Sequence, residues 1–352
     1  MANEVRISFY GDFTFGENYQ ARYDFQEKTN ILRQRGYDFL FDNVKRFLYG
    51  SDFNVINLET SLSNVKTSYL EAKKAVVHWS DPEIAPKLLK KYKIHAASLG
   101  NNHSFDFGEA GLKQSLDVLR KENISCFGAG MNEEEAKKPL KKEFIINKTP
   151  FNLYIFGGYK YREDYDKDFD FYARGAKAGV NLLTVERAAD EIKNIKANDP
   201  YAYIVIFIHF GFDLQKTVNA QIESARGFID CGADLVAGHG PHMINRFEIY
   251  KEKPIIYSLG NFIFPADFRG KCAPYNLVAM LNVAEADNKV KTSISLYPIY
   301  MDTNSKTPKT RLITKDEVSE VIEHLSEGDE KIKKIFKVKE DNFAIRICAD
   351  SL

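Results

Sequence analysis

The chain has 352 residues, of which 44% are hydrophobic and 28% are charged, so it can bury a substantial core. Lysine and arginine together number 49, as do aspartate and glutamate, and the formal net charge is therefore zero. A balanced charge creates no field that would steer the protein onto nucleic acid, and we expect no nucleic-acid partner. The longest apolar stretch, residues 203–212, is far shorter than the roughly 20 residues of a membrane-spanning helix.

The cysteines and the N-terminus bear on the cellular compartment. Cys126, Cys231, Cys272 and Cys348 are widely scattered and form no CxxC pair, which is typical of a protein in a reducing compartment. The first residues lead directly into a predicted strand, without the basic and apolar segments of a signal peptide. We therefore expect a cytoplasmic protein with no membrane segment.

Strand-like apolar runs alternate with helical patterns through the first two-thirds of the chain. Predicted strands cover residues 5–10, 53–58, 95–99, 124–127, 201–208 and 235–237, and predicted helices cover residues 37–48, 81–92, 109–121, 184–196 and 219–231. Residues 142–146 and 151–156 predict an antiparallel hairpin. Residues 159–177, rich in tyrosine, aspartate and lysine, have no period and predict a loop over the functional site.

The last third of the chain is richer in strands. Strands of antiparallel character are predicted near residues 246–250, 255–258 and 294–298, followed by short helices at 319–325 and 331–336 and a last strand at 343–347. This order predicts an α/β fold built as a layered α/β/β/α sandwich. We expect residues 1–300 to form one domain and residues 301–352 to form an extension packed on it.

Polar residues follow the apolar runs at the points where the predicted strands end. They are Asp12, Glu59, Asn102 with His103, His209, and His239 with His242. Loops at the carboxyl ends of neighbouring parallel strands converge on one crevice, where open α/β sheets bind ligands. Carboxylates, an amide and imidazoles gathered there suit Mn, Fe or Zn. The sequence therefore predicts a two-metal hydrolytic centre.

Two motifs carry most of this prediction. Gly238-His239-Gly240-Pro241-His242 places two imidazoles three residues apart on a stiff loop, which can give one histidine to each of two metals about 3.5–4 Å apart. In the segment after residue 99, Asn102 can supply a weak amide ligand and His103 can act as a general acid, with Asp106 as the next candidate for that role. The structural alternative for this segment is an Asx-rich turn that caps the following helix.

The remaining candidates are less specific. Asn261 lies just beyond a predicted strand and can hydrogen-bond a ligand histidine, although a turn asparagine is the equally simple interpretation. His78, His95 and His324 lie outside these motifs, and we expect no functional role for them.

Together these motifs resemble the CapA family, the capsule-synthesis, poly-γ-glutamate-associated branch of the calcineurin-like metallophosphoesterase superfamily. The segments that carry the resemblance are Gly11-Asp12, Asn57-Leu58-Glu59-Thr60, Asn101-Asn102-His103 with Asp106 and Gly108, His209-Phe210-Gly211, the loop from Gly238 to His242, and Tyr257-Ser258-Leu259-Gly260-Asn261-Phe262. The resemblance runs from Asp12 to about Phe264. It implies a four-layer α/β/β/α sandwich with a dinuclear metal site.

The resemblance also implies a role for each residue. Asp12 and His242 would bind one metal, Asn102, His209 and His239 the other, and Glu59 would be the bridging carboxylate. His103 would be the histidine that handles the leaving group without binding metal. Thr14 stands where the superfamily has a histidine, so the first metal is expected to bind more weakly. Glu17 and Asp213 replace an arginine and a glutamate of the family, and these departures bear on substrate contacts.

The expected function is a metal-dependent hydrolase with two divalent ions, acting on a phosphoester or amide bond. Its substrate would be a small molecule or an anionic polymer, linked to poly-γ-glutamate capsule metabolism. The alternative is a non-catalytic, metal-dependent protein that binds or assembles polyglutamate in capsule biosynthesis. A third interpretation is a structural α/β protein with core histidines. Turnover that a chelator abolishes separates the first two, and absence of bound metal favours the third.

Overall fold

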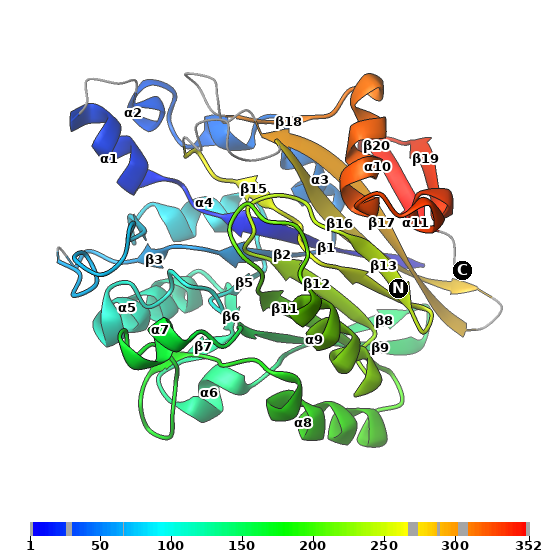
Figure 1. The fold of residues 1–352 in the computed structure, drawn as a ribbon, viewed down its shortest axis with the longest axis horizontal. Coiled ribbons are helices and arrows are strands. Elements are labelled where there is room, and N and C mark those ends of the chain that lie inside the picture. The colour runs from blue at the N-terminus through cyan, green and yellow to red at the C-terminus, as the bar shows by residue number, and fades with distance from the viewer. Residues whose placement is uncertain are drawn as a thin grey trace.

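Two large β-sheets organise the chain (Figure 1). The computed structural model describes residues 3–25, 30–65, 67–266, 274–286, 289–301 and 309–349. The larger sheet runs in the order β19 (Phe336–Glu340), β20 (Ile345–Ala349), β17 (Lys289–Met301), β16 (Tyr275–Ala286), β1 (Glu4–Phe13), β2 (Phe53–Leu58), β5 (Ala96–Ser98) and β6 (Ser125–Phe127), with β15 (Asn261–Ile263) beside β1 and β18 (Thr310–Leu312) beside β17. Its strands β1, β2, β5 and β6 are parallel, whereas β16 to β20 pair antiparallel.

The smaller sheet has its parallel strands in the middle. Its order is β13 (Phe247–Tyr250), β14 (Lys253–Ile256), β12 (Leu235–His239), β11 (Ala202–His209), β9 (Thr149–Tyr159) and β8 (Leu140–Ile146). Strands β14, β12, β11 and β9 are parallel, and β13 and β8 pair antiparallel at the two edges. Two short pairs complete the strands, β3 (Ser61–Leu62) with β4 (Trp79–Ser80) and β7 (Ala129–Gly130) with β10 (Gly179–Val180).

The helices lie around these strands. They are α1 (Glu17–Phe25), α2 (Ile31–Arg35), α3 (Lys45–Gly50), α4 (Ala85–Lys91), α5 (Gly108–Lys121), α6 (Glu133–Lys137), α7 (Glu163–Lys167), α8 (Val185–Asn198), α9 (Asn219–Asp230), α10 (Val318–Ser326) and α11 (Glu330–Ile335), with 3-10 turns η1 (Asp38–Phe41) and η2 (Lys315–Glu317). In Figure 1, α8 lies below the strands, and α10 and α11 accompany β19 and β20 at the upper right.

Three large hydrophobic clusters of the described residues hold the elements together, beside a small one of Phe264, Ala266 and Met301. In β1, Ile7 and Phe9 join a cluster with Phe207 of β11, so this core draws on both large sheets. Successive side chains of a strand point to opposite faces, and Tyr10, next to Phe9 in β1, belongs to a second cluster with α3, α4 and α5. Ile206 of β11 belongs to a third cluster with α8 and α9.

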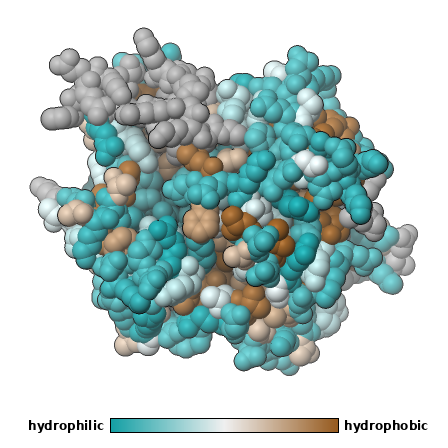
Figure 2. Space-filling view, in the orientation of Figure 1, coloured by the Kyte–Doolittle hydropathy of each residue, from teal (hydrophilic) through white to brown (hydrophobic). Residues whose placement is uncertain are grey.

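The face in Figure 2 is mostly hydrophilic, with hydrophobic side chains gathered near its middle.

The predicted α/β class is confirmed, and so are most of the stronger elements. The helix expected at residues 109–121 is α5, and the expected hairpin is β8 with β9. The single helix predicted at residues 37–48 is wrong, because η1 and α3 are separated by a turn at Asp42 and Asn43, residues that favour turns. The helix predicted from Asp81 begins at Ala85, since the Asp81 carboxylate first accepts two backbone N–H groups in a turn.

The end of the chain extends the larger sheet. Strands β18, β19 and β20 all come from beyond residue 300, and β18 and β20 both pair with β17. The expected division into a domain of residues 1–300 and an extension of residues 301–352 stays a prediction. Among the described ranges, no helix has the length and apolar character needed to cross a membrane.

We predict that Gly11 tolerates no side chain. A Cβ atom at this position would lie 1.8 Å from the carbonyl oxygen of Gly260, so Gly11→Ala must displace the chain that enters β15. We expect a loss of about 3 kcal/mol in the free energy of unfolding, measured by urea denaturation. The control is Gly175→Ala, whose Cβ meets no atom within 4 Å and whose positive φ of 53° costs only the roughly 1–2 kcal/mol of a left-handed backbone. Equal losses in the two variants would contradict the prediction.

Candidate metal centre

The candidate ligands lie at the carboxyl ends of strands from both large sheets, as the sequence predicted. Asp12 is near the end of β1, and Glu59 follows the last residue of β2. His209 and His239 end β11 and β12 and are direct register partners, so their side chains start side by side. His242 follows three residues later in a left-handed backbone conformation, with φ of 59°.

The Asp12 carboxylate lies among three imidazoles. Its Oδ1 is 3.5 Å from His239 Nδ1 and 3.9 Å from His209 Nδ1, and its Oδ2 is 3.4 Å from His242 Nδ1. The Nδ1 atoms of His209 and His239 are themselves only 3.1 Å apart. These nitrogens and oxygens converge on one small volume, which is the geometry expected of metal ligands.

Asp12 is fixed in place from two directions. Asn57 Nδ2 donates to Oδ1 at 2.8 Å, and the backbone N–H of Gly240 donates to Oδ2 at 3.1 Å. Burial would raise the pKa of Asp12, but the hydrogen bond with His239, and then the neighbouring imidazoles of His242 and His209, outweigh it and hold that pKa below its usual range. Asp12 therefore stands ready as a carboxylate.

Glu59 is the most unusual group of the site. Its side chain is fully buried, and neither carboxylate oxygen has a hydrogen-bond partner among the described residues. Oε1 lies 3.8 Å from His242 Nε2 and 3.9 Å from His103 Nε2. Burial, and then the charge of Asp12, raise the pKa of Glu59 well above its ordinary value. A buried carboxyl group without partners is costly, and a cation would relieve that cost.

The ligand atoms form two groups that share one residue. Asp12, His209 and His239 can present ligand atoms within 4.8 Å of one another, and so can Asp12, Glu59 and His242. The donor set of carboxylates and imidazoles fits Mn, Fe or Zn. Asp12 belongs to both of these groups, and the bridging role that the family resemblance implies for Glu59 stays a prediction.

The histidines are held in the form that binds metal. Burial lowers the pKa of His209 and that of His239, so each imidazole is neutral near neutral pH and keeps a lone pair for a ligand. Asn261 Oδ1 lies 2.9 Å from His242 Nδ1, the kind of contact expected of a residue that orients a ligand histidine. Asn261 is also the register partner of Asp12 between β15 and β1.

His103 and Asp106 form a buried pair beside these ligands. His103 Nδ1 lies 2.6 Å from Asp106 Oδ2, which leaves Nε2 facing Glu59. The other Asp106 oxygen accepts from Lys74 Nζ at 2.5 Å, and the backbone N–H of His78 donates to Oδ2 at 2.7 Å. Because its oxygens are engaged in this way, Asp106 orients His103 and does not face the ligands.

His78 lies in the site although the sequence gave no reason to expect it there. Its ring stacks on that of His103 at 3.5 Å, its Nδ1 is 2.9 Å from the Glu59 carbonyl oxygen, and its Nε2 is 2.9 Å from the Tyr19 hydroxyl. Glu59, His78 and His103 also meet the distance criterion of a metal group. Both ring nitrogens of His78 are already engaged, however, so we assign it a packing and orienting role.

A cleft of about 350 Å³ gives access to this centre. Asn102, His103 and His242 line it, and the Asn102 Oδ1 atom is buried without a hydrogen-bond partner in the described part of the chain. The segment predicted to be a loop over the site contributes Arg162 and Tyr165 to the wall, and part of that segment forms α7. Asn102 is therefore placed where a weak ligand could complete the centre.

Thr14, Glu17 and Asp213, the three residues that depart from the family pattern, lie in different surroundings. Thr14 is buried, and its hydroxyl accepts the backbone N–H of Gly16 at 3.1 Å. The Glu17 carboxylate accepts from Ser80 Oγ at 2.6 Å and from Tyr37, so it is committed inside the protein. Asp213 alone of the three lines the cleft.

Comparison with known proteins identifies the family of this centre. Residues 6–266 match the family model described as bacterial capsule synthesis protein PGA_cap. The chain therefore belongs to this family, as the motifs at the strand ends predicted. These residues include all the candidate ligands.

Three relatives illustrate the match. The PGA biosynthesis protein CapA of Bacillus subtilis is 30% identical over 264 residues, which cover 74% of this chain and 63% of that protein. The capsule biosynthesis protein CapA of Bacillus anthracis is 27% identical over 325 residues, covering 86% of this chain and 76% of that protein. A probable polyglutamine synthesis accessory protein of Mycobacterium tuberculosis is 26% identical over 219 residues, covering 60% and 56%.

We predict opposite effects on stability for two buried glutamates. Glu59→Met removes a carboxyl group without partners, so the chelator-treated protein should gain roughly 1–3 kcal/mol in the free energy of unfolding. The same variant should lose the rise in melting temperature that Mn²⁺ gives the unmodified protein. The control Glu17→Met removes a hydrogen-bonded carboxylate and should destabilise the protein instead. Destabilisation by both substitutions would contradict a metal-binding role for Glu59.

Proposed function

We propose that this protein is a metal-dependent hydrolase with two divalent ions, acting on a phosphoester or amide bond of an anionic substrate. The observation that carries the proposal is the Glu59 carboxylate, which is fully buried without a partner among the described residues and lies under 4 Å from two imidazoles. For the fold we also propose the four-layer α/β/β/α sandwich. One large cluster joins the two sheets in a shared core, and the other two pack helices against the sheets from outside, as that architecture requires.

The ligand assignment follows the two groups of atoms. His209 and His239 would hold one ion with Asn102, Glu59 and His242 would hold the other, and Asp12 would contact both. When bound, a pair of such ions lowers the pKa of water and polarises the bond to be cleaved. The protein itself would position the substrate in the cleft and keep bulk water out of the buried part of the centre.

Proton transfer would fall to His103. Burial, and then Lys74, lower its pKa well below the ordinary value, so the resting imidazole is neutral. With Nδ1 bonded to Asp106, Nε2 lies on the side of Glu59 and the candidate ligands, where it can take a proton before delivering it to the leaving group. Asp106 would keep the ring in this orientation and stabilise the imidazolium when it forms.

The substrate proposal rests on the family. The family is described by capsule synthesis, and relatives are named for PGA biosynthesis and for polyglutamine synthesis, so we take an amide-linked polymer of glutamate or glutamine residues as the substrate class. Those names describe biosynthesis and not hydrolysis, which favours a second candidate, a non-catalytic protein that binds polyglutamate through its metals. Release of glutamate from a γ-linked oligomer, or of phosphate from an ester, that EDTA abolishes would support the hydrolase over the binder.

The two ions should differ in affinity. Thr14 stands where the superfamily supplies a histidine, and its hydroxyl is occupied by a backbone N–H, so an ion held by His242 would have one protein ligand fewer. Calorimetric titration of chelator-treated protein with Mn²⁺ should show two unequal steps with up to two equivalents bound. Two equally tight steps would contradict the missing-ligand argument, and no binding at all would overturn the proposed function.

His103 should be needed for turnover but not for metal. We expect His103→Asn to lose about 10²–10⁴-fold in rate, because a positioned proton carrier contributes that much, while the metal content measured by elemental analysis stays near normal. His239→Ala should lose both metal and turnover, since His239 belongs to a ligand group.

The control for these two variants is His324→Asn, at a histidine that contributes to none of the three metal groups. This variant should keep both metal and rate. A metal-free His103→Asn would show that His103 is a ligand, and an unchanged rate would show that the proton is carried by another group.

A further inference from the structure

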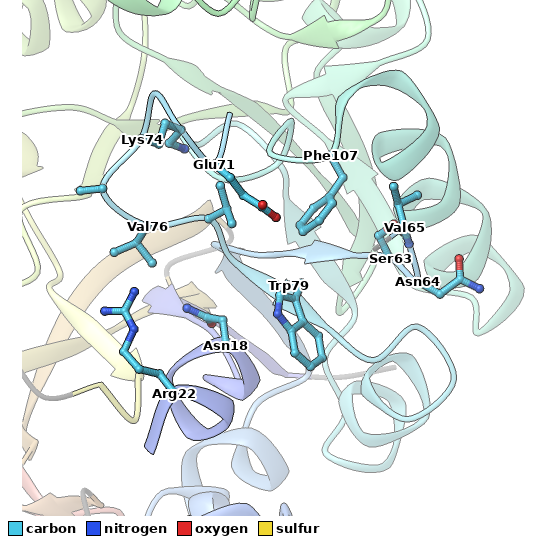
Figure 3. Close-up of a pocket in the computed structure, with 12 residues that line it drawn as sticks. Asn18, Arg22, Ser63, Asn64, Val65, Glu71, Lys74, Val76, Trp79 and Phe107 are labelled. Carbon is cyan, nitrogen blue, oxygen red and sulfur yellow. Dashed lines mark hydrogen bonds between the residues drawn. The ribbon is translucent and has the colours of Figure 1, made fainter. Parts of the chain in front are cut away.

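A second and larger cavity lies beside the metal cleft. It encloses about 520 Å³ between α1, the residues around Ser63, the segment 71–79 and the first turn of α5 (Figure 3). The two cavities have part of their lining in common, because Lys74, Ala75 and Val76 line both. Residues 74–76 therefore form a common wall, and a chain-like ligand would reach from this cavity into the metal cleft by crossing over that wall.

The wall of residues 74–76 that both cavities share is fixed by hydrogen bonds on the side of the metal cleft. The Lys74 side chain is only 5% exposed, and its Nζ donates to Asp106 Oδ1 at 2.5 Å and to the Asn102 carbonyl oxygen at 2.7 Å. Asp106 in turn holds His103. The position of this wall is therefore tied to the residues that bear the proposed chemistry.

One side of the second cavity offers unpaired donors. The guanidinium of Arg22 has no hydrogen-bond or ion-pair partner within the described ranges, and it is exposed. On Asn18, one turn earlier on α1, the side-chain Nδ2 donor makes no hydrogen bond to the described residues, and the buried acceptor Oδ1 has no partner among them either. Figure 3 shows both side chains on α1 at the same end of the cavity. A guanidinium with a neighbouring amide suits a carboxylate.

The rest of the lining offers an acceptor and flat apolar surface. Glu71 is exposed, and its carboxylate accepts a single backbone N–H, that of Ser68, at 3.3 Å. Trp79 and Phe107 add aromatic surface against which methylene groups can pack. A ligand that suits both sides carries a carboxylate, an N–H donor and a short aliphatic portion.

We propose that this cavity binds a residue of an amide-linked acidic chain that flanks the bond placed at the metal centre. Its carboxylate lies on Arg22 and Asn18, its amide N–H faces Glu71, and its methylene groups lie on Trp79. A polyphosphate would satisfy Arg22 but would offer no N–H to Glu71 and would be repelled by its charge. The inference rests on the proposed function for the cleavage step, but binding in the cavity stands apart from catalysis.

The test uses the fact that Trp79 is the one tryptophan of the whole chain. The probe is a synthetic γ-linked glutamate pentamer, titrated into the full chain with EDTA present so that no turnover occurs. The tryptophan emission should change saturably, and Arg22→Gln should weaken the apparent Kd about tenfold through the loss of one charge-assisted interaction. Arg22→Glu, which reverses the charge, should abolish binding in this range.

The control is Arg120→Gln, at an exposed arginine of α5 that lines neither cavity, and it should bind the pentamer like the unmodified chain. Thermal melting checks that each variant is folded. Absence of a saturable change, or an unchanged Kd for both Arg22 variants, overturns the inference. Polyphosphate that binds as tightly as the pentamer, with the same dependence on Arg22, also overturns it.

The same titration separates this inference from the proposed function. Arg22-dependent binding of the pentamer by metal-loaded protein that never cleaves it supports the cavity assignment and contradicts the hydrolase. Cleavage of the pentamer with a KM that does not depend on Arg22 supports the hydrolase and contradicts the cavity assignment.

Discussion

The buried carboxylate of Asp12 is the constraint on which the rest of the centre depends. The backbone N–H of Asp12 donates to the Gly260 carbonyl oxygen at 2.8 Å. This close approach is possible only because Gly11, the preceding residue, has no side chain. That contact sets β15 beside β1 and makes Asn261 the neighbour of Asp12. Asn261 then bonds His242, so one close backbone contact positions residues from three separate segments.

The centre is assembled against the local preferences of its residues. Glu59 is buried with two unsatisfied oxygens, and His242 adopts a left-handed backbone conformation that a non-glycine residue rarely takes. Neither feature helps the chain to fold. Such groups persist where the surrounding packing determines them and where a bound ligand compensates for them, which is why their coincidence at one point carries more weight than either alone.

The part of the site that the sequence could predict is the part built on parallel strands. His209 and His239 follow strong apolar runs, and the geometry of a parallel sheet brings such strand ends together whatever the rest of the chain does. His78 and Lys74 could not be found in this way. They lie in the irregular segment before β4, and their places depend on the carboxylate of Asp106, which accepts from both. The α/β class was predictable because strong apolar runs alternate with helical patterns along the chain. The prediction of one helix at 37–48 was wrong because hydrophobic spacing alone does not show where a turn interrupts a helix.

The network around Asp106 joins recognition to chemistry through a few contacts. Asp106 holds the imidazole of His103 through one oxygen, and through the other it binds Lys74, which stands in the wall common to both cavities. A ligand that moved this wall would alter the charge beside Asp106 and the orientation of the His103 ring. Because the pair of Lys74 and Asp106 is buried, its electrostatic interaction is little screened by water, and a small displacement there has a large effect. The wall that borders both cavities and the orientation of the proposed proton carrier therefore depend on the same buried carboxylate, that of Asp106.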